Sequence, residues 1–481
     1  MKTIFNISFC LLLILSGNTY AHNAVKQFLS SPYLNGASVS IMIKDIDSGL
    51  VVYSFDAERE VIPASVMKTV TTAAALEILG ENFRYETAIM YDGKIKGDIL
   101  DGNLYIRGSG DPTLGSRYIN LSKDKIIREW INTIKNAGIS TIAGAIIADE
   151  SIFDTEGISM KWMREDIGSY YGQGSYGLNI FDNSYTLFLN SGEPGSKPEI
   201  EKTEPEQPST VFHNYLTSTK TLKDSTYIVG FPYSTEHYLY GIVPANSFGY
   251  KLKGDIPDPA LFLAQYLTQL LKDENITING DPSCYRLLSQ KGKWEKSERI
   301  LLTTTFSPPL KDIVRITNHE SNNLYADALL KTIGLQYRSE EVVSSFGKGI
   351  QIINKHWEEK GLKTSSLWMF DGSGLASTDK ITAGFLCELL TYMATKSKSS
   401  TAFIESIPRP GMDGTVANML RGSELQGKAR LKSGSMSRVR SYAGYVTKNN
   451  KRYAVAIIVN NFSCNQSQIK NDIEQLLLSL F

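Results

Sequence analysis

The chain has 481 residues, which is too long for one compact core, so two or three domains are expected. Its 50 basic residues balance its 50 acidic residues, and 42% of the chain is hydrophobic, as in an ordinary globular protein. The even charge, with no basic stripe carrying interleaved aromatic residues, argues against a nucleic-acid-binding function.

The first residues have the three-part pattern of a secretory signal peptide. Lys2 gives a positive start, residues 4–15 are mostly apolar, and Thr19-Tyr20-Ala21 offers small residues at positions −3 and −1 of a cleavage site. We therefore expect residues 1–21 to be removed and the mature protein to be exported. The alternative is a membrane anchor, but the apolar run is shorter than the roughly 20 residues that span a bilayer.

The remaining cysteines and the histidines predict no metal and no cofactor. Removal of the signal leaves Cys284, Cys387 and Cys464, an odd number that we interpret as buried small hydrophobic residues. No pair of histidines has metal-ligand spacing, so a zinc enzyme is disfavoured. No Gly-x-Ser-x-Gly elbow is present, so a Ser-His-Asp hydrolase is disfavoured too.

The chain begins with a predicted hairpin and helix. Residues 37–44 alternate as a strand, residues 45–49 turn, and residues 50–55 return. A helix is expected over residues 65–79, with Pro63 marking its entry.

The pattern of predicted elements changes from about Asn82 onward. Strands are expected over residues 85–91, 99–107 and 141–149, and helices over residues 123–137 and 258–273. A long loop rich in tyrosine and glycine is expected over residues 162–183, and a surface connection with four prolines over residues 193–208.

The last third returns to a helix-rich pattern and ends with three strands. Helices are expected over residues 310–316, 322–334, 342–360, 383–396 and 468–480, and strands over residues 429–433, 441–448 and 452–460. Two strands from the start and three from the end would form one five-stranded antiparallel sheet, with the first and last helices covering a face. The fold class is therefore expected to be α+β, with a large β-rich insertion in the middle.

The expected domains follow from this pattern. They are a signal peptide at 1–21, a main domain of residues 22–82 and 300–481, an inserted domain of residues 83–160 and 240–299, and a second inserted domain of residues 161–239.

Ser65-Val66-Met67-Lys68 is a Ser-x-x-Lys tetrad. Residues i and i+3 share a helix face, so the hydroxyl and the amine can touch. A serine needs a base to become a nucleophile, and a lysine can serve when desolvation or a second cation lowers its pKa. The same spacing also occurs at Ser122/Lys125, Ser345/Lys348, Ser377/Lys380 and Ser467/Lys470. Only the first tetrad follows a hairpin and opens an apolar helix, which singles it out.

Ser321-Asn322-Asn323 is a Ser-x-Asn triplet just before an expected helix. The hydroxyl can relay a proton between a leaving nitrogen and a lysine, and the amide can both donate to and accept from a peptide bond. The triplet equally suits a helix N-cap, and both roles stay open.

Lys432-Ser433-Gly434-Ser435 ends an expected strand. A lysine and a hydroxyl there can bind a terminal carboxylate, and the glycine lets backbone approach closely. The N–H of Ser435 and the N–H of Ser65 would make the two halves of an oxyanion hole. Taken alone, the segment would be interpreted as a strand-end turn.

Together, in this order and on these elements, the three motifs resemble those of the D-alanyl-D-alanine carboxypeptidase/endopeptidases of the peptidase S13 family, the low-molecular-mass class C penicillin-binding proteins. The resemblance extends to Gly-Ser-Gly-Asp-Pro-Thr-Leu at 108–114, Asp-Gly-Ser-Gly-Leu at 371–375, Asp-Gly-Thr at 413–415 and the Tyr/Gly-rich stretch 166–183. It also includes the gap of about 250 residues between the first two motifs, which smaller β-lactamases lack. It therefore covers nearly all of the mature chain.

The resemblance implies a β-lactamase/transpeptidase-like catalytic domain in which Ser65 attacks the carbonyl between two D-alanines and forms an acyl-enzyme. Lys68 would take the serine proton, and Ser321 would pass a proton to the leaving amine. Water would then release the acyl group. β-Lactams would mimic the dipeptide and trap Ser65.

The remaining motif residues would bind the substrate, which the resemblance implies to be a peptidoglycan peptide ending in D-Ala-D-Ala. Asn323 would hold the substrate amide, Lys432 would support the electrostatics of the pocket, and Ser433 would contact the carboxylate. With the signal peptide, this substrate class implies the periplasm or the outer cell surface, with at most peripheral membrane contact.

Two departures from the family pattern stand out. Serine occupies position 433 where threonine is usual, which keeps the hydroxyl but loses the methyl group that fixes its rotamer. Ser435 and Met436 after the third motif are a second, milder variation. Asp371 is family-like, but a structural role in a turn is sufficient for it.

Three other functions stay open. A β-lactamase would share the fold, although the long insertion argues against it. A cell-wall binding protein would keep the pocket without turnover, and an exported esterase would use the same serine and lysine on other substrates.

Overall fold

The computed structural model describes residues 22–119, 123–221, 225–336 and 344–481. The expected signal peptide at 1–21 lies outside the described residues, as does the expected beginning of one helix at Val342. The described chain forms two compact units. The first contains residues 22–82, 310–322 and 349–481, and the second contains residues 83–309 and 323–348. The three domains expected from the sequence stay a prediction, because a compact unit need not be one folding domain.

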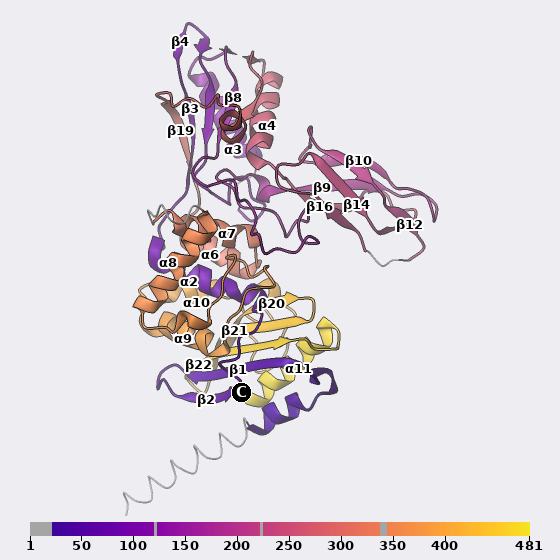
Figure 1. Cartoon of the computed structure of the whole chain (residues 1–481), viewed down its shortest axis with the longest axis vertical. Helices are drawn as coiled ribbons and strands as arrows, with labels where there is room; N and C mark the ends of the chain where they lie inside the picture. Colours follow the sequence, from indigo (N-terminus) through magenta and orange to yellow (C-terminus); the bar gives the residue numbers. More distant parts are fainter. Residues whose placement is uncertain (1–21, 120–122, 222–224, 337–343) are drawn as a thin grey trace, which may run out of the picture. The chain divides into compact units, whose positions relative to one another are not determined.

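The first unit is built on one five-stranded antiparallel sheet with the order β2-β1-β22-β21-β20 (Figure 1). Its strands are β1 (Ser38–Asp45), β2 (Val51–Phe55), β20 (Ala429–Met436), β21 (Val439–Lys448) and β22 (Lys451–Asn460). Both ends of the chain contribute to it, which confirms the predicted sheet and the α+β fold class.

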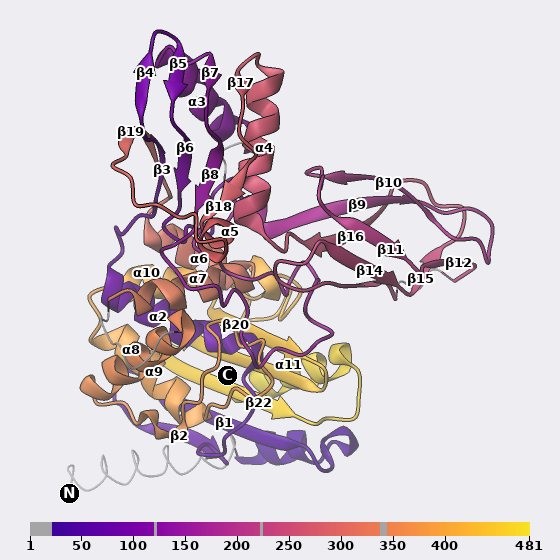
Figure 2. The same ribbon diagram turned by 45° about the horizontal axis from the view of Figure 1, so that its top comes forward.

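Helices cover both faces of this sheet (Figure 2). The helices of the first unit include α2 (Met67–Leu79), α6 (Leu310–His319), α9 (Ala383–Thr395), α10 (Ser400–Ser406), α11 (Gln466–Leu480) and most of α8 (Ser345–Glu359). Side chains on a strand alternate between faces. Accordingly Ile41 and Ile43 of β1 pack into a buried cluster with α11, whereas Lys44 points the other way and pairs with Glu388 of α9 at 2.5 Å.

The second unit is rich in short strands, as expected for the inserted region. A five-stranded sheet has the order β18-β8-β6-β3-β19, and its strands are β3 (Glu86–Tyr91), β6 (Leu104–Arg107), β8 (Ile146–Asp149), β18 (Ser283–Cys284) and β19 (Ile300–Phe306). A four-stranded sheet consists of β4 (Lys94–Lys96), β5 (Ile99–Asp101), β7 (Thr141–Ile142) and β17 (Thr277–Ile278).

Smaller sheets and several helices complete the second unit. The sheets contain β9 (Ser184–Asn190), β10 (Glu199–Glu204) and β16 (Tyr250–Asp255); β11 (Val211–Asn214), β13 (Tyr227–Val229) and β14 (Glu236–Tyr240); and β12 (Thr217–Thr219) with β15 (Ile242–Pro244). The helices are α3 (Lys123–Asn136), α4 (Pro259–Asp273), α7 (Asn323–Gly334), the short α5 (Tyr285–Gln290) and the first turn of α8.

Two strands that the sequence predicts as continuous are each broken in two. The expected strand 99–107 separates into β5 and β6 at Gly102, and the expected strand 141–149 separates into β7 and β8 around Gly144. The two breaks lie side by side, because the Gly144 N–H donates to the Gly102 carbonyl at 2.9 Å. Periodicity alone does not show such a paired kink.

One predicted connection contains a strand. Within residues 193–208, Glu199–Glu204 forms β10 at the edge of its sheet, paired with β9. The four prolines of this stretch flank the strand and do not interrupt it. An edge strand tolerates charged residues and nearby prolines, which explains why its composition resembled that of a loop.

The central strand of the first sheet should carry much of its stability. Ile457 of β22 is fully buried between Ile41 and Tyr442 on the neighbouring strands. Ile457→Ala should lower the free energy of unfolding by about 2–5 kcal/mol, measured by urea denaturation. Leu50→Ala, at a side chain that is 67% exposed, should change it by less than about 0.5 kcal/mol. Equal effects of the two substitutions would contradict this assignment of the core.

Candidate active site

The nucleophile predicted from the sequence lies in a tight turn at the start of the first long helix. Ser65 sits in a 3-10 turn (Ala64–Val66) that leads directly into α2, one turn earlier than a regular helix start. Ala64 has φ +48°, a left-handed conformation that costs a non-glycine residue about 1–3 kcal/mol. The turn therefore holds the half-buried Ser65 in a defined position.

Lys68 lies one turn further along and reaches back to the serine. Its Nζ is 3.0 Å from Ser65 Oγ and donates a hydrogen bond to the Ser373 carbonyl at 2.6 Å. The lysine side chain is fully buried. A buried amine within hydrogen-bond distance of a serine hydroxyl is the arrangement that general-base activation requires.

A loop around Asp371 fixes the carbonyl that binds Lys68. The buried Asp371 carboxylate accepts hydrogen bonds from three backbone N–H groups, those of Ser373 (3.0 Å), Gly374 (2.6 Å) and Ala376 (2.7 Å). Three such bonds fold the backbone tightly around the carboxylate. Asp371 thus has a structural role in a turn, and this turn holds the Ser373 carbonyl near Lys68.

A second serine and lysine pair lies in the same unit. Lys432 of β20 is fully buried, and its Nζ donates to Ser321 Oγ at 2.8 Å and to the Ser433 carbonyl at 2.7 Å. Ser321 lies in the turn after α6, at φ +54°. The second and third sequence motifs therefore meet, although about 110 residues separate them.

The two lysines influence each other electrostatically. Burial, together with the positive charges of Lys68 and Arg440, holds the pKa of Lys432 well below its usual range. Two ammonium groups in one buried site repel each other strongly because the local dielectric constant is low. Less than two full positive charges are therefore expected on the Lys68 and Lys432 pair at neutral pH.

Strand β20 runs against the turn that carries Ser65. A Cβ atom built on Gly434 would lie 2.8 Å from the Pro63 carbonyl oxygen and 2.9 Å from the Ser65 nitrogen, so only glycine fits there. Ser441 on the neighbouring strand donates to the same Pro63 carbonyl at 2.6 Å. Strand β20 thus contacts the turn of the first motif and, through Lys432, also Ser321 of the second motif, all within the first unit.

Strand β20 is an edge strand of its sheet, and its open edge faces away from β21. On this edge the Leu431 N–H donates to the Pro408 carbonyl at 2.9 Å. Because backbone groups alternate along a strand, the N–H groups of Ser433 and Ser435 point in the same direction as that of Leu431. The N–H groups of Ser433 and Ser435 thus lie on the edge of β20 that has no partner strand.

The side chains of Ser433 and Ser435 differ in their surroundings. The Ser433 hydroxyl lies 2.7 Å from Thr415 Oγ1 and is 8% exposed as a residue, whereas Ser435 is exposed. Thr415 belongs to the Asp-Gly-Thr segment noted in the sequence. It supports the rotamer of Ser433 from the side.

Asn323 is the first residue of α7 and belongs to the second unit. Its Nδ2 donates to the Tyr171 carbonyl at 2.8 Å. Tyr171 lies in the Tyr/Gly-rich stretch. The other predicted site residues, namely Ser65, Lys68, Ser321, Lys432, Ser433 and Ser435, belong to the first unit.

Sequence reasoning missed several supporting groups. It did not anticipate the Ser373 carbonyl, the Thr415 hydroxyl or the Ser441 hydroxyl as neighbours of the motif residues. The sequence did contain a signal for the first two, because they belong to the Asp-Gly-Ser-Gly and Asp-Gly-Thr segments that resemble those of the family. Ser441 had no distinguishing signal, because it lies in an ordinary strand pattern.

The described residues contain no candidate metal site, disulfide or membrane-spanning helix. In them, no three His, Cys, Asp or Glu side chains are grouped so as to hold a metal ion. The three cysteines of this part of the chain are free, with Cys284 and Cys387 buried and Cys464 partly buried. None of the described helices has both the length and the apolar composition needed to cross a membrane.

Comparisons with known proteins agree on one family. The model of the "D-Ala-D-Ala carboxypeptidase 3 (S13) family" matches residues 21–480. A D-alanyl-D-alanine carboxypeptidase of Actinomadura sp. (strain R39) is 26% identical over 454 residues, which cover 91% of this chain and 80% of that protein. The D-alanyl-D-alanine carboxypeptidase DacB of Haemophilus influenzae is 25% identical over 471 residues, which cover 96% of this chain and 93% of that protein.

The structure is also similar to solved structures of a penicillin-binding protein. Two crystal structures of penicillin binding protein 4 from Haemophilus influenzae, one of them complexed with a β-lactam, superpose with TM-scores of 0.79 and 0.74. Their sequence identities to this chain are 22% and 21%, and each covers 94% of this chain and 98% of the other. The likeness shows a shared fold.

The contact between the Asp371 loop and the Ser65 turn can be tested with a glycine. A Cβ on Gly374 would lie 2.0 Å from the Ala64 carbonyl oxygen, so Gly374→Ala must displace the turn. Misplacement of a reacting group by about 1 Å can lower a rate about 100-fold. We expect a decrease of this size in the rate at which an activated ester acylates Ser65, measured by mass spectrometry.

A matched glycine provides the control for this substitution. Gly361 also has a positive φ, +83°, but nothing lies within 4 Å of the position that a Cβ atom would occupy there, so Gly361→Ala adds the same backbone strain without the contact. It should leave the rate of Ser65 acylation nearly unchanged. If both variants slow acylation alike, strain and not the contact is responsible.

Proposed function

The chain belongs to the D-Ala-D-Ala carboxypeptidase 3 (S13) family, and from this premise we propose how its own residues cleave a D-alanyl peptide bond. The protein is a serine-type hydrolase that cleaves D-alanyl-D-alanine bonds of peptidoglycan peptides through an acyl-enzyme, and β-lactams inhibit it covalently. The observation that carries the residue assignment is the pair of contacts from Lys68 to Ser65 and from Lys432 to Ser321 within one compact unit.

Ser65 is the nucleophile, and Lys68 is its base. The uncharged Lys68 amine accepts the hydroxyl proton as Ser65 Oγ attacks the carbonyl carbon between the two D-alanines. The Lys68 side chain is fully buried, and burial disfavours the charged form of an amine, which supports its role as the base. The Ser373 carbonyl keeps the amine in place.

Ser321 delivers a proton to the leaving nitrogen. Its hydroxyl accepts a hydrogen bond from Lys432 at 2.8 Å, which orients it, and the proton that Lys68 took from Ser65 replaces the one that Ser321 gives to the D-alanine amine, so that Lys68 is uncharged again. Breakage of the C–N bond then releases D-alanine and leaves the acyl group on Ser65. Attack by water on the ester, with Lys68 again as base, completes hydrolysis.

The substrate is held by the edge of β20 and by the second motif. The Ser433 hydroxyl, supported by Thr415, contacts the terminal carboxylate, and Lys432 supports the electrostatics of the pocket. The N–H groups of Ser65 and Ser435 bind the oxyanion, a role supported by the close approach of Gly434 to the Ser65 nitrogen. Asn323 holds the substrate amide, a role supported by the Ser-x-Asn spacing.

The enzyme acts outside the cytoplasm, in the periplasm or at the outer cell surface, since its substrate lies there and its first residues resemble a signal peptide. Its contact with the membrane is at most peripheral, and it has no nucleic-acid partner. Its activity needs no metal or cofactor. Mass spectrometry of the mature N-terminus after expression in a Gram-negative host should find His22 as the first residue.

The nucleophile is tested with penicillin. Ser65→Ala should abolish the covalent mass gain after incubation with benzylpenicillin, because no other group supplies the attacking oxygen. Ser467→Ala is the matched control, since Ser467 is exposed, begins a Ser-x-x-Lys tetrad of the same spacing and should label normally. Normal labelling of Ser65→Ala would refute the assignment, and a wild-type protein that gains no mass would indicate a binding protein without turnover.

The substitution at the third motif has its own test. Ser433→Thr should keep kcat/KM on a D-Ala-D-Ala peptide within about threefold, because the hydroxyl is retained. Ser433→Ala should raise KM, because the partner of the carboxylate is lost. A large loss with threonine would show that the pocket has been reshaped around serine and the Thr415 hydroxyl.

Product analysis separates the competing activities. Purified protein should release D-alanine from a free pentapeptide, and its rate on cross-linked peptidoglycan would measure endopeptidase activity. Rapid turnover of penicillin without a stable adduct would instead favour a β-lactamase. Hydrolysis of simple esters without release of D-alanine would favour an esterase.

A further inference from the structure

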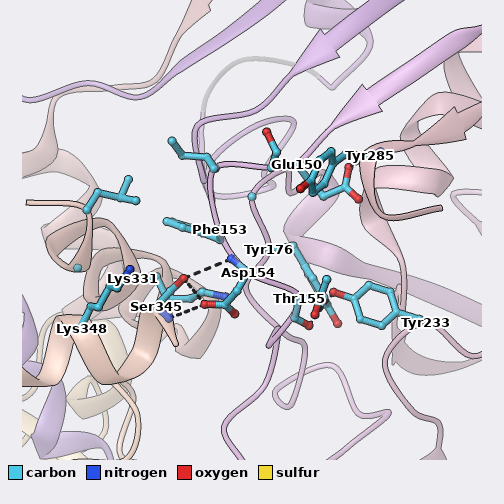
Figure 3. Close-up of a pocket in the computed structure, with 15 residues that line it drawn as sticks. Glu150, Phe153, Asp154, Thr155, Tyr176, Tyr233, Tyr285, Lys331, Ser345 and Lys348 are labelled. Atoms are coloured by element: carbon cyan, nitrogen blue, oxygen red, sulfur yellow. Dashed lines mark hydrogen bonds between the residues drawn. The ribbon is translucent and has the colours of Figure 1, made fainter. Parts of the chain in front are cut away.

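The second unit contains a cavity that the proposed reaction does not use (Figure 3). Its volume is about 490 Å³, within the range of small-molecule sites. It is lined by the segment 150–155 after β8, by the end of α7 and the start of α8, and by three tyrosines, Tyr176, Tyr233 and Tyr285. All the lining residues belong to the second unit, whereas Ser65 belongs to the first.

One end of the cavity is cationic. Lys348 lies on the first turn of α8, and among the described residues its amine has no ion-pair partner. Beside it, Lys331 of α7 is fully buried, with Nζ donating to the carbonyls of Glu156 (2.7 Å) and Ser175 (2.8 Å), and burial lowers the pKa of Lys331 to about 8. Lys348 is therefore the cation that can take up an anionic group.

The other end of the cavity is anionic. Figure 3 shows Glu150 and Tyr285 across the cavity from the two lysines. The Glu150 carboxylate accepts the backbone N–H groups of Arg286 (2.9 Å) and Tyr285 (3.1 Å), which fix its orientation. Burial raises the pKa of Glu150 to about 6, so a cationic ligand group beside it would stabilise the ionised form.

Other lining groups are already held in place, with Asp154 and Ser345 beside the two lysines (Figure 3). Asp154 accepts hydrogen bonds from Ser345 N at 2.5 Å and from Ser345 Oγ at 2.6 Å, and Tyr233 donates to the Thr155 carbonyl at 2.8 Å. Ser345 and Lys348 have the same Ser-x-x-Lys spacing as Ser65 and Lys68. However, the Ser345 hydroxyl already donates a hydrogen bond to Asp154. This tetrad therefore belongs to a preorganised binding site and not to a second nucleophile.

The charges restrict the chemistry of the ligand. A simple anion at Lys348 would leave Glu150 without a cationic partner, and a simple cation at Glu150 would leave Lys348 without an anionic one. A neutral sugar would leave both Lys348 and Glu150 without a charged partner. A ligand with a carboxylate at one end and an ammonium group at the other satisfies both ends of the cavity.

We propose that this cavity binds a short zwitterionic peptide, with the peptide carboxylate at Lys348 and its ammonium group at Glu150. The inference rests on the proposed function for the source of such a ligand, because each hydrolysis of a D-alanyl bond creates one new carboxylate and one new ammonium group. The cavity thus provides a second site for peptides of the substrate or product class, separate from Ser65.

The test uses protein whose Ser65 has been acylated by benzylpenicillin, so that the catalytic site is filled. D-Alanyl-D-alanine is titrated into this protein and its binding is measured by calorimetry, with one binding event per chain expected. N-Acetyl-D-alanyl-D-alanine lacks the ammonium group and D-alanyl-D-alanine amide lacks the carboxylate, and each should bind about tenfold more weakly.

Variants of the protein test the same contacts by removing the charges that line the cavity. Lys348→Ala and Glu150→Gln should each weaken binding of the dipeptide about tenfold. Lys355→Ala removes a charge from an exposed position on the same helix and should leave binding unchanged. Equal urea midpoints for all variants will show that they are folded.

The outcomes separate this inference from the proposed function. No binding of D-alanyl-D-alanine to the acylated protein, or equal affinity for the acetylated and amidated peptides, would overturn the cavity as a zwitterion site. Unchanged affinity in Lys348→Ala would overturn it as well. Failure of penicillin to add mass would count against the proposed function alone, and the titrations would then be made on Ser65→Ala protein with the same variants.

Discussion

The burial of two lysines in one unit is the constraint on which the rest of the site depends. Lys68 and Lys432 are both fully inaccessible to solvent, and each is within hydrogen-bond distance of a serine hydroxyl. Two buried ammonium groups cannot both stay charged without a large electrostatic cost, and the pKa of Lys432 is accordingly held well below its usual range. The carbonyls of Ser373 and Ser433 then stabilise whichever amine holds the proton.

The sequence predicted the framework of the fold well, because its strongest signals are long and periodic. The first hairpin, the three last strands and most helices were predicted within a few residues, and the sheet that joins the two chain ends followed from them. The short strands β5 to β8 and β10 were harder. Their limits are set by glycines packed against neighbouring backbone and by edge pairing, which composition does not record.

The site shows a similar division between motif residues and their supports. Ser65, Lys68, Ser321 and Lys432 could be named because each combines a reactive side chain with a fixed spacing or a recognisable element. The groups that position them are mostly backbone carbonyls, such as those of Ser373 and Pro63, and any residue type can supply a carbonyl. Their roles appear only when distant segments are folded together.

The edge position of β20 has a consequence for what the enzyme can accept. A chain that lies along this open edge must be fully extended over several residues, since only an extended backbone matches the spacing of outward N–H groups. Helices and compact turns are rejected before any side chain is recognised. A segment held in a folded structure would therefore have to unfold before its backbone could pair with this edge.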